Sequence, residues 1–274
     1  MTGSTLEAVL RRDRLIVAVA LALMVVLAWA YVLWLVADMA MGGMDMTGFR
    51  MVPAGIGMMI PASAPWTAVE FAFVFVMWAV MMVGMMAPSA APMILIYARV
   101  GRQAKASGKP LAATGWFAAG YFLAWTGFSL VAALVQWGVE RAALLNSQMA
   151  SASNVLGGIV LIAAGVYQWT PLKDACLVQC QAPLQFLIRH GGFRGDLQGC
   201  VSLGFRHGLY CVGCCWVLMA LLFVGGVMNV LWIALLALLV LFEKLAPFGR
   251  WVARAVGVAC VASGAWMLMS TPQG

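Results

Sequence analysis

Long apolar runs dominate the chain, and polar residues collect in the segments between them. A run of about 20 apolar residues can cross a bilayer as a helix. The strands of a β-barrel would instead alternate apolar and polar positions. We therefore expect one all-α transmembrane helical bundle over residues 1–274, and in its second span we expect Pro88 and Pro92 to break or end the helix. Hydropathy predicts seven spans, at residues 15–36, 66–96, 111–137, 154–169, 208–227, 229–242 and 251–269.

The basic residues between these spans are unevenly distributed. If the N-terminus is cytoplasmic, every Lys and Arg except Arg50 and Arg141 falls on the cytoplasmic side. Because Lys and Arg collect on that side of membrane proteins, the pattern predicts a cytoplasmic N-terminus and a periplasmic C-terminus. We expect a multi-pass protein of a bacterial inner membrane, surrounded by membrane lipid.

Composition supports a membrane protein and excludes several functions. Hydrophobic residues make up 65% of the chain and charged residues 9%, whereas soluble proteins carry about 25% charged residues. The net charge of +7 follows from the topology, and no basic patch with interleaved aromatics indicates a nucleic-acid partner. No phosphate-binding loop or dinucleotide fingerprint is present, so neither an ATP-driven pump nor a Rossmann enzyme is indicated. We expect a protein that is not an enzyme. The chain contains 20 Met and 7 Cys but only 2 His, which directs attention to sulfur ligands.

The predicted external loop, residues 38–65, is rich in Met and Gly and contains Met41, Met44 and Met46. Thioethers bind Cu(I) and not hard cations. Unlike thiols, they do not form disulfides in an oxidising periplasm. This loop is therefore interpreted as a copper-collecting segment. The alternative is a flexible segment filled with adaptable Met side chains.

The second predicted span combines a carboxylate with a cluster of methionines. Glu70 lies about one turn inside the membrane, where a carboxylate usually marks a pathway or a structural partner. Met77, Met81 and Met85 recur every four residues and so share one helical face. We interpret the span as a copper path whose mouth is Glu70. The alternative is core packing of the Met and a structural hydrogen bond of Glu70. The methionines of this cluster are Met77, Met81, Met82, Met85 and Met86.

The fifth predicted span opens with Cys211, Cys214 and Cys215, whose spacing places three thiols on one helical face. Converging sulfurs can hold a soft metal, and a reducing cytosol disfavours a disulfide at this depth. Residues 82–86 and 211–215 share the pattern sulfur-Val-Gly-sulfur-sulfur, so the two segments are hypothesised to share one metal. The alternative is that the thiols pack as small hydrophobic groups.

A second cysteine pair lies in the predicted cytoplasmic loop, residues 171–207. Cys176 and Cys180 are four residues apart, a spacing that suits a Cu(I) or Zn(II) clamp. We interpret the pair as an exit site at which metal is handed on.

Several motifs together resemble a bacterial family described as predicted metal-binding integral membrane proteins, a domain of unknown function. The resemblance implies a helical bundle of about seven spans and a bound metal, for which copper fits best. The first span and the Met-rich loop lie outside it. The matching motifs are Trp78-x2-Met81-Met82-x2-Met85-Met86-x-Pro88-Ser89-x2-Pro92, Thr170-Pro171-Leu172-Lys173-x2-Cys176-Leu177-x2-Cys180, Cys211-x-Gly213-x-Cys215-Trp216, Met228-Asn229-x2-Trp232 and Glu243-Lys244.

We therefore expect a non-enzymatic protein that binds and relays Cu(I) through Met and Cys, with Zn(II) as the less favoured metal. Its expected partners are a copper donor or a copper acceptor, such as a copper enzyme. Two alternatives remain open. One is a structural subunit of a larger membrane complex. The other is a thiol-redox protein that uses Cys211 and Cys214 or Cys214 and Cys215.

Overall fold

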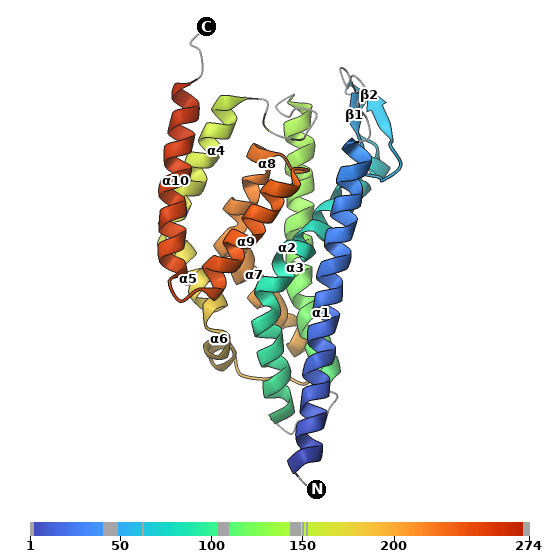
Figure 1. Ribbon diagram of the computed structural model, residues 1–274, viewed down its shortest axis with the longest axis vertical. Coiled ribbons are helices and arrows are strands. Elements are labelled where there is room, and N and C mark those ends of the chain that lie inside the picture. The colour runs from blue at the N-terminus through green and yellow to red at the C-terminus, as the bar shows by residue number, and fades with distance from the viewer. Residues whose placement is uncertain are drawn as a thin grey trace.

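The computed structural model describes residues 3–40, 49–61, 63–103, 110–142, 149, 151 and 153–270, and Figure 1 shows an elongated helical bundle. A small antiparallel hairpin of β1 (Phe49–Met51) and β2 (Met59–Pro61) lies at one end. Apart from this hairpin, the structure is helical, and the expected all-α class is confirmed. The helices are α1 (Gly3–Ala40), α2 (Ala68–Gln103), α3 (Pro110–Arg141), α4 (Asn154–Tyr167), α5 (Pro171–Gln181), α6 (Pro183–Arg189), α7 (Leu197–Ala220), α8 (Leu222–Gly225), α9 (Val230–Leu245) and α10 (Gly249–Met269).

Fewer helices than expected have the length of a membrane span. α4 and α5 are apolar and long enough only when taken together, and the chain bends by 65° between them. α9 has 16 residues, fewer than the roughly 20 of an ordinary span. The described residues thus contain five candidate spans, or six with the bent pair, and the predicted seven are not confirmed. The five are Leu15–Met39, Ala68–Arg102, Ala112–Arg141, Leu197–Gly225 and Gly249–Met269.

Glycines set the closest helix contacts, as small residues do between membrane helices. α7 runs parallel to α3, and a Cβ on Gly208 would lie 2.8 Å from the Tyr121 carbonyl oxygen. α4 and α10 run antiparallel, and a Cβ on Gly165 would lie 2.6 Å from the Gly257 carbonyl oxygen. The first contact brings Tyr121 of α3 beside Gly208, which lies one helical turn before Cys211 on α7.

The outer faces of the long helices are apolar. Large side chains such as Leu23 on α1, Val131 on α3 and Trp266 on α10 are exposed. Exposing so apolar a surface to water is unfavourable, whereas lipid could cover it. Long apolar helices with such faces are compatible with a membrane protein.

α2 does not break at its prolines, contrary to expectation. The helix continues through Pro88 and Pro92 to Gln103. Prolines are tolerated in membrane helices when neighbouring groups satisfy the freed backbone. Here the Ser89 hydroxyl donates to the Met86 carbonyl at 2.9 Å.

The two predicted loops contain regular structure. α1 continues through Asp38 to Ala40, and the hairpin follows within the expected external loop. The expected cytoplasmic loop contains α5, α6 and the first turns of α7. The Thr170 side chain caps α5 and Asp196 caps α7, each accepting from a backbone N–H of the first turn.

Candidate metal centre

The Cys211 sulfur is the point at which side chains from three helices converge. It lies on α7, 2.7 Å from the Lys244 ammonium of α9 and 2.9 Å from the Tyr121 hydroxyl of α3. All three residues are buried. Sequence analysis identified the cysteine but neither of its partners.

Lys244 holds its charge among sulfur and hydroxyl groups. Its ammonium also lies 3.3 Å from the Ser89 hydroxyl and 3.8 Å from the Cys215 sulfur. In the described residues, no carboxylate contacts it. A buried ammonium without an anion is costly, so the short contact with Cys211 is that of an ammonium–thiolate ion pair. Cys211 is therefore the anionic group of the centre.

Two further thiols point along α7. Cys214 and Cys215 donate to the Cys211 carbonyl oxygen at 3.1 and 2.9 Å. Both are buried. In this arrangement their S–H groups are engaged with the backbone, which distinguishes them from the sulfur of Cys211.

The cysteines of α5 lie against the same face of α7. Cys180 is a partly exposed residue, and its thiol is close enough to hydrogen-bond with the thiols of Cys211 and Cys214. Cys176 packs over Gly213, with its sulfur 2.8 Å from the position that a Cβ there would take. The separate exit site expected in a loop is thus a helix packed on the Cys211 centre.

A second buried ion pair joins α5 to α9, next to Lys244 in sequence. The Lys173 ammonium of α5 lies 2.6 Å from Glu243 of α9, and both side chains are at most 2% exposed. The Gln168 amide donates to the other Glu243 carboxylate oxygen at 2.9 Å, and the Gln181 amide donates to the Glu243 carbonyl at 2.7 Å. The Glu243 charge is thereby neutralised by Lys173 and is not shared with Lys244.

His207 lies one helical turn before Cys211 on α7 and is 3% exposed. Its ring packs against Phe117, Tyr121 and Phe186. Among the described residues, its Nδ1 has no hydrogen-bond partner. Sequence analysis placed this histidine in a loop and gave it no role.

The five candidate methionines of α2 are all at most 2% exposed, namely Met77, Met81, Met82, Met85 and Met86. Met81 and Met85 border a narrow gap that Trp29 of α1 and Ile233 of α9 also line. Met86 approaches the centre through its carbonyl, which lies 3.4 Å from the Tyr121 hydroxyl. The segments 82–86 and 211–215 therefore meet at Tyr121, which contacts both Met86 and Cys211. That they share a metal stays a prediction.

Glu70 has its carboxylate occupied. One oxygen lies 2.8 Å from Arg50, and the other accepts from the Thr67 backbone N–H at 2.7 Å. The geometry is that of the structural hydrogen bonds given as the alternative for Glu70, with Arg50 as its cation. Met41, Met44 and Met46 lie outside the described residues.

In the part of the chain that the structure describes, no three or more His, Cys, Asp or Glu side chains are grouped so as to hold a metal ion. The expected three-thiol site of Cys211, Cys214 and Cys215 is therefore not preformed. The donor set that remains is the Cys211 thiolate with the neighbouring Cys180 thiol. Two soft sulfurs suit Cu(I).

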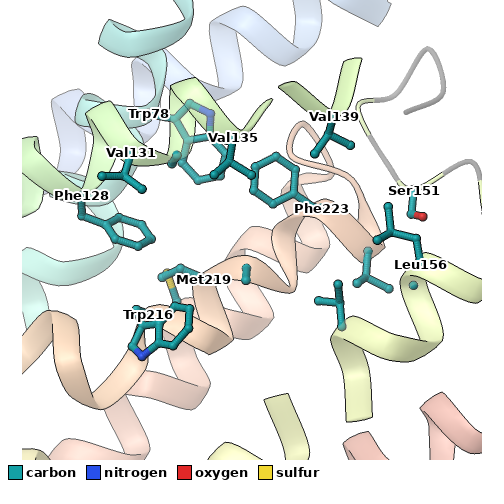
Figure 2. Close-up of a pocket in the computed structure, with 15 residues that line it drawn as sticks. Trp78, Phe128, Val131, Val135, Val139, Ser151, Leu156, Trp216, Met219 and Phe223 are labelled. Atoms are coloured by element: carbon teal, nitrogen blue, oxygen red, sulfur yellow. The ribbon is translucent and has the colours of Figure 1, made fainter. Parts of the chain in front are cut away.

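An apolar cavity of about 310 Å³ lies on another face of α7, bordered by α3, α4 and α8. Figure 2 shows Trp78, Trp216, Met219 and Phe223 around it. None of its lining residues is charged. Neither Cys211 nor Lys244 is among the residues that line it.

Lys244 was missed because it was counted as a topological charge at the end of a span. The structure leaves it 4% exposed, and Lys173, counted in the same way, is fully buried. The available signal was the position of Lys244 in a strongly apolar segment, where an ionisable residue usually has a function. Tyr121 gave no comparable signal.

The geometry above agrees with one comparison to known proteins. Residues 75–267 match the model of the family PpoB2, described as a copper chaperone. No curated protein and no solved structure matches the chain. PpoB2 is a metal-related family, although not the one that the sequence motifs resemble. Because the match covers most of the chain, including every residue of the Cys211 centre, the chain belongs to the PpoB2 family of copper chaperones.

Proposed function

We propose that the protein is a membrane-embedded Cu(I) chaperone whose cargo is held at Cys211. The observation that carries the proposal is the Cys211 sulfur, buried and 2.7 Å from the Lys244 ammonium, with the Cys180 thiol beside it. A thiolate is the form of cysteine that binds metals. The ion pair keeps that form available in an apolar interior.

The chemistry of the centre favours a soft cation. Thiolate and thioether ligands select Cu(I), whereas carboxylates and carbonyls suit hard cations. In the described residues, Lys173 occupies the Glu243 carboxylate and Arg50 occupies that of Glu70. Sulfur is therefore the ligand type left available at Cys211.

We further propose that methionines deliver the cargo. Met41, Met44 and Met46 would collect Cu(I) outside, Glu70 would mark the mouth, and the Met face of α2 would lead to Cys211. Transfer among soft sites of similar affinity needs no energy source. Replacing Met82, Met85 and Met86 by Leu should then slow copper loading at least tenfold. Unchanged loading would assign these residues to packing.

We propose seven passes, with the N-terminus in the cytoplasm. In Figure 1, the start of α1 and the end of α10 lie at opposite ends of the long axis, as an odd number of passes requires. The short helices α4 and α9 would supply the two passes that length alone does not count. The positions of Lys and Arg support the orientation, although Lys173 and Lys244 form buried ion pairs.

We propose that the role is delivery, without catalysis, between a copper donor and a copper acceptor in the bacterial inner membrane. Cys180 supports this part, because it is partly exposed while its thiol neighbours Cys211 and Cys214 are buried. Among the thiol-bearing residues of the centre, Cys180 is therefore the one through which we expect metal to be exchanged with a partner.

An anaerobic Cu(I) titration against a chromogenic chelator tests the proposal. Cys211→Ser should weaken binding at least tenfold, because serine supplies no soft thiolate. Cys260→Ser is the matched control, since Cys260 is also a buried free cysteine but lies on α10. Equal affinities of the two variants would contradict the proposal.

A further inference from the structure

We propose that Lys244 is the counter-ion of a two-thiolate site formed by Cys211 and Cys180, and that its fixed charge selects a monovalent soft cation over Zn(II). The inference rests on the proposed function and adds the basis of its metal selectivity.

Four thiols lie close together at the centre, those of Cys180, Cys211, Cys214 and Cys215, but two of them are directed elsewhere. Cys211 on α7 and Cys180 on α5 are within hydrogen-bonding reach across the helix interface. Cys214 and Cys215 instead direct their S–H groups at the Cys211 carbonyl. The described residues offer no third His, Cys, Asp or Glu that completes a larger site. Cu(I) accepts two thiolates, whereas structural Zn(II) sites use four ligands.

Charge then decides which cation the site accepts. Two thiolates and Cu(I) leave one negative charge, which the ammonium of Lys244 cancels. Two thiolates with Zn(II) are already neutral, so Lys244 would leave one positive charge uncompensated. An unpaired charge is costly in an apolar interior. Within the described ranges, no second anion relieves it, because the Glu243 carboxylate is paired with Lys173 at 2.6 Å.

Lys244 is held where this effect requires it. Its ammonium contacts the Cys211 sulfur at 2.7 Å, the Ser89 hydroxyl at 3.3 Å and the Cys215 sulfur at 3.8 Å. These contacts come from α2 as well as α7. Ser89 and Cys215 thus keep the charge beside the site when the Cys211 sulfur binds metal.

The test compares the Cu(I) and Zn(II) dissociation constants of the full chain in detergent, each measured against a competing chelator. Lys244→Met should shift the ratio of the two constants toward Zn(II) by at least tenfold. Lys244→Arg, which keeps the charge, should leave the ratio within about threefold of wild type.

The outcomes separate this inference from the proposed function. If Lys244→Met leaves the ratio unchanged, or weakens the binding of both metals equally, the counter-ion role is overturned. The proposed function still stands in that case, because the wild-type protein binds Cu(I). A wild-type protein that binds no Cu(I) overturns both.

A measurement on the wild-type protein keeps the inference testable if Lys244→Met does not fold. X-ray absorption at the copper edge of the Cu(I)-loaded chain should show two sulfur neighbours. Three or more sulfurs, or a nitrogen ligand such as His207, would overturn the two-thiolate site.

Discussion

At the scale of single residues, the charge on Cys211 depends on the groups around its sulfur. Lys244 supplies the cation, and Tyr121 supplies a hydroxyl at 2.9 Å. Both come from helices other than α7, so neighbouring helices set the chemistry of the thiol. Hydrogen bonds to a ligand orient it and tune the metal.

Tyr121→Phe should therefore weaken Cu(I) binding about tenfold, because groups that support a ligand typically contribute 10–100-fold to metal affinity. Tyr97→Phe is the matched control, since the Tyr97 hydroxyl contacts Cys200, outside the centre, at 3.4 Å. A chelator competition measures both variants. An equal effect of the two substitutions would show that Tyr121 acts only through packing.

The sequence predicted the candidate sulfur atoms but not the groups that control them. Three thiols on one helical face follow from the spacing of Cys211, Cys214 and Cys215, and all three are buried as a packed face requires. Lys244 lies 33 positions after Cys211. Its contact follows from how α9 packs on α7, which periodicity along one helix does not contain.

At the scale of helices, α5 presents Cys180 to α7 because polar contacts hold it against α9. The Lys173–Glu243 pair and the Gln181 amide join the two helices. A pair this deeply buried contributes little net stability when intact, but loss of one partner leaves a buried charge. These polar contacts thus fix the position of α5 against α9.

Glu243→Gln should lower the free energy of unfolding by about 3–5 kcal/mol, because Lys173 would be left charged and unpaired. The double variant Glu243→Gln with Lys173→Met should recover part of the loss. Thermal unfolding in detergent measures both. Asp174→Asn is the control, since Asp174 neighbours Lys173 in sequence but is only partly buried. A single variant as stable as wild type would contradict the role of the pair.

Hydropathy predicted the long helices well and the short ones less well. α2 and α3 coincide with predicted spans apart from their ends. α5 was missed because its apolar positions are few, although Thr170-Pro171 is a helix-start signal. The continuity of α2 through Pro88 and Pro92 depends on neighbouring groups that no local rule contains.

At the scale of the whole molecule, the two ends of the bundle differ in the elements that they carry. The hairpin and the end of α10 lie toward the same end in Figure 1, opposite the start of α1. The Arg50–Glu70 pair lies at the hairpin end. An external hairpin is consistent with Arg50 being one of two basic residues outside the cytoplasmic set.

Fusions at the C-terminus test this topology. Alkaline phosphatase, which folds only in the oxidising periplasm, should be active when fused after residue 274. A green fluorescent protein exported to the same side should stay dark. The same two reporters fused after Lys105, between α2 and α3, should give the opposite pattern. Matching patterns at the two sites would contradict an odd number of passes.

The central claim is that the protein carries copper at Cys211. Elemental analysis of protein purified from copper-supplied cells tests it most directly, with wild type measured beside Cys211→Ser. Wild type should contain about one copper per chain and little zinc, since thiolate ligands in this charge environment favour Cu(I). Cys211→Ser should be nearly copper-free. Equal copper in the two proteins, or none in wild type, would contradict the account.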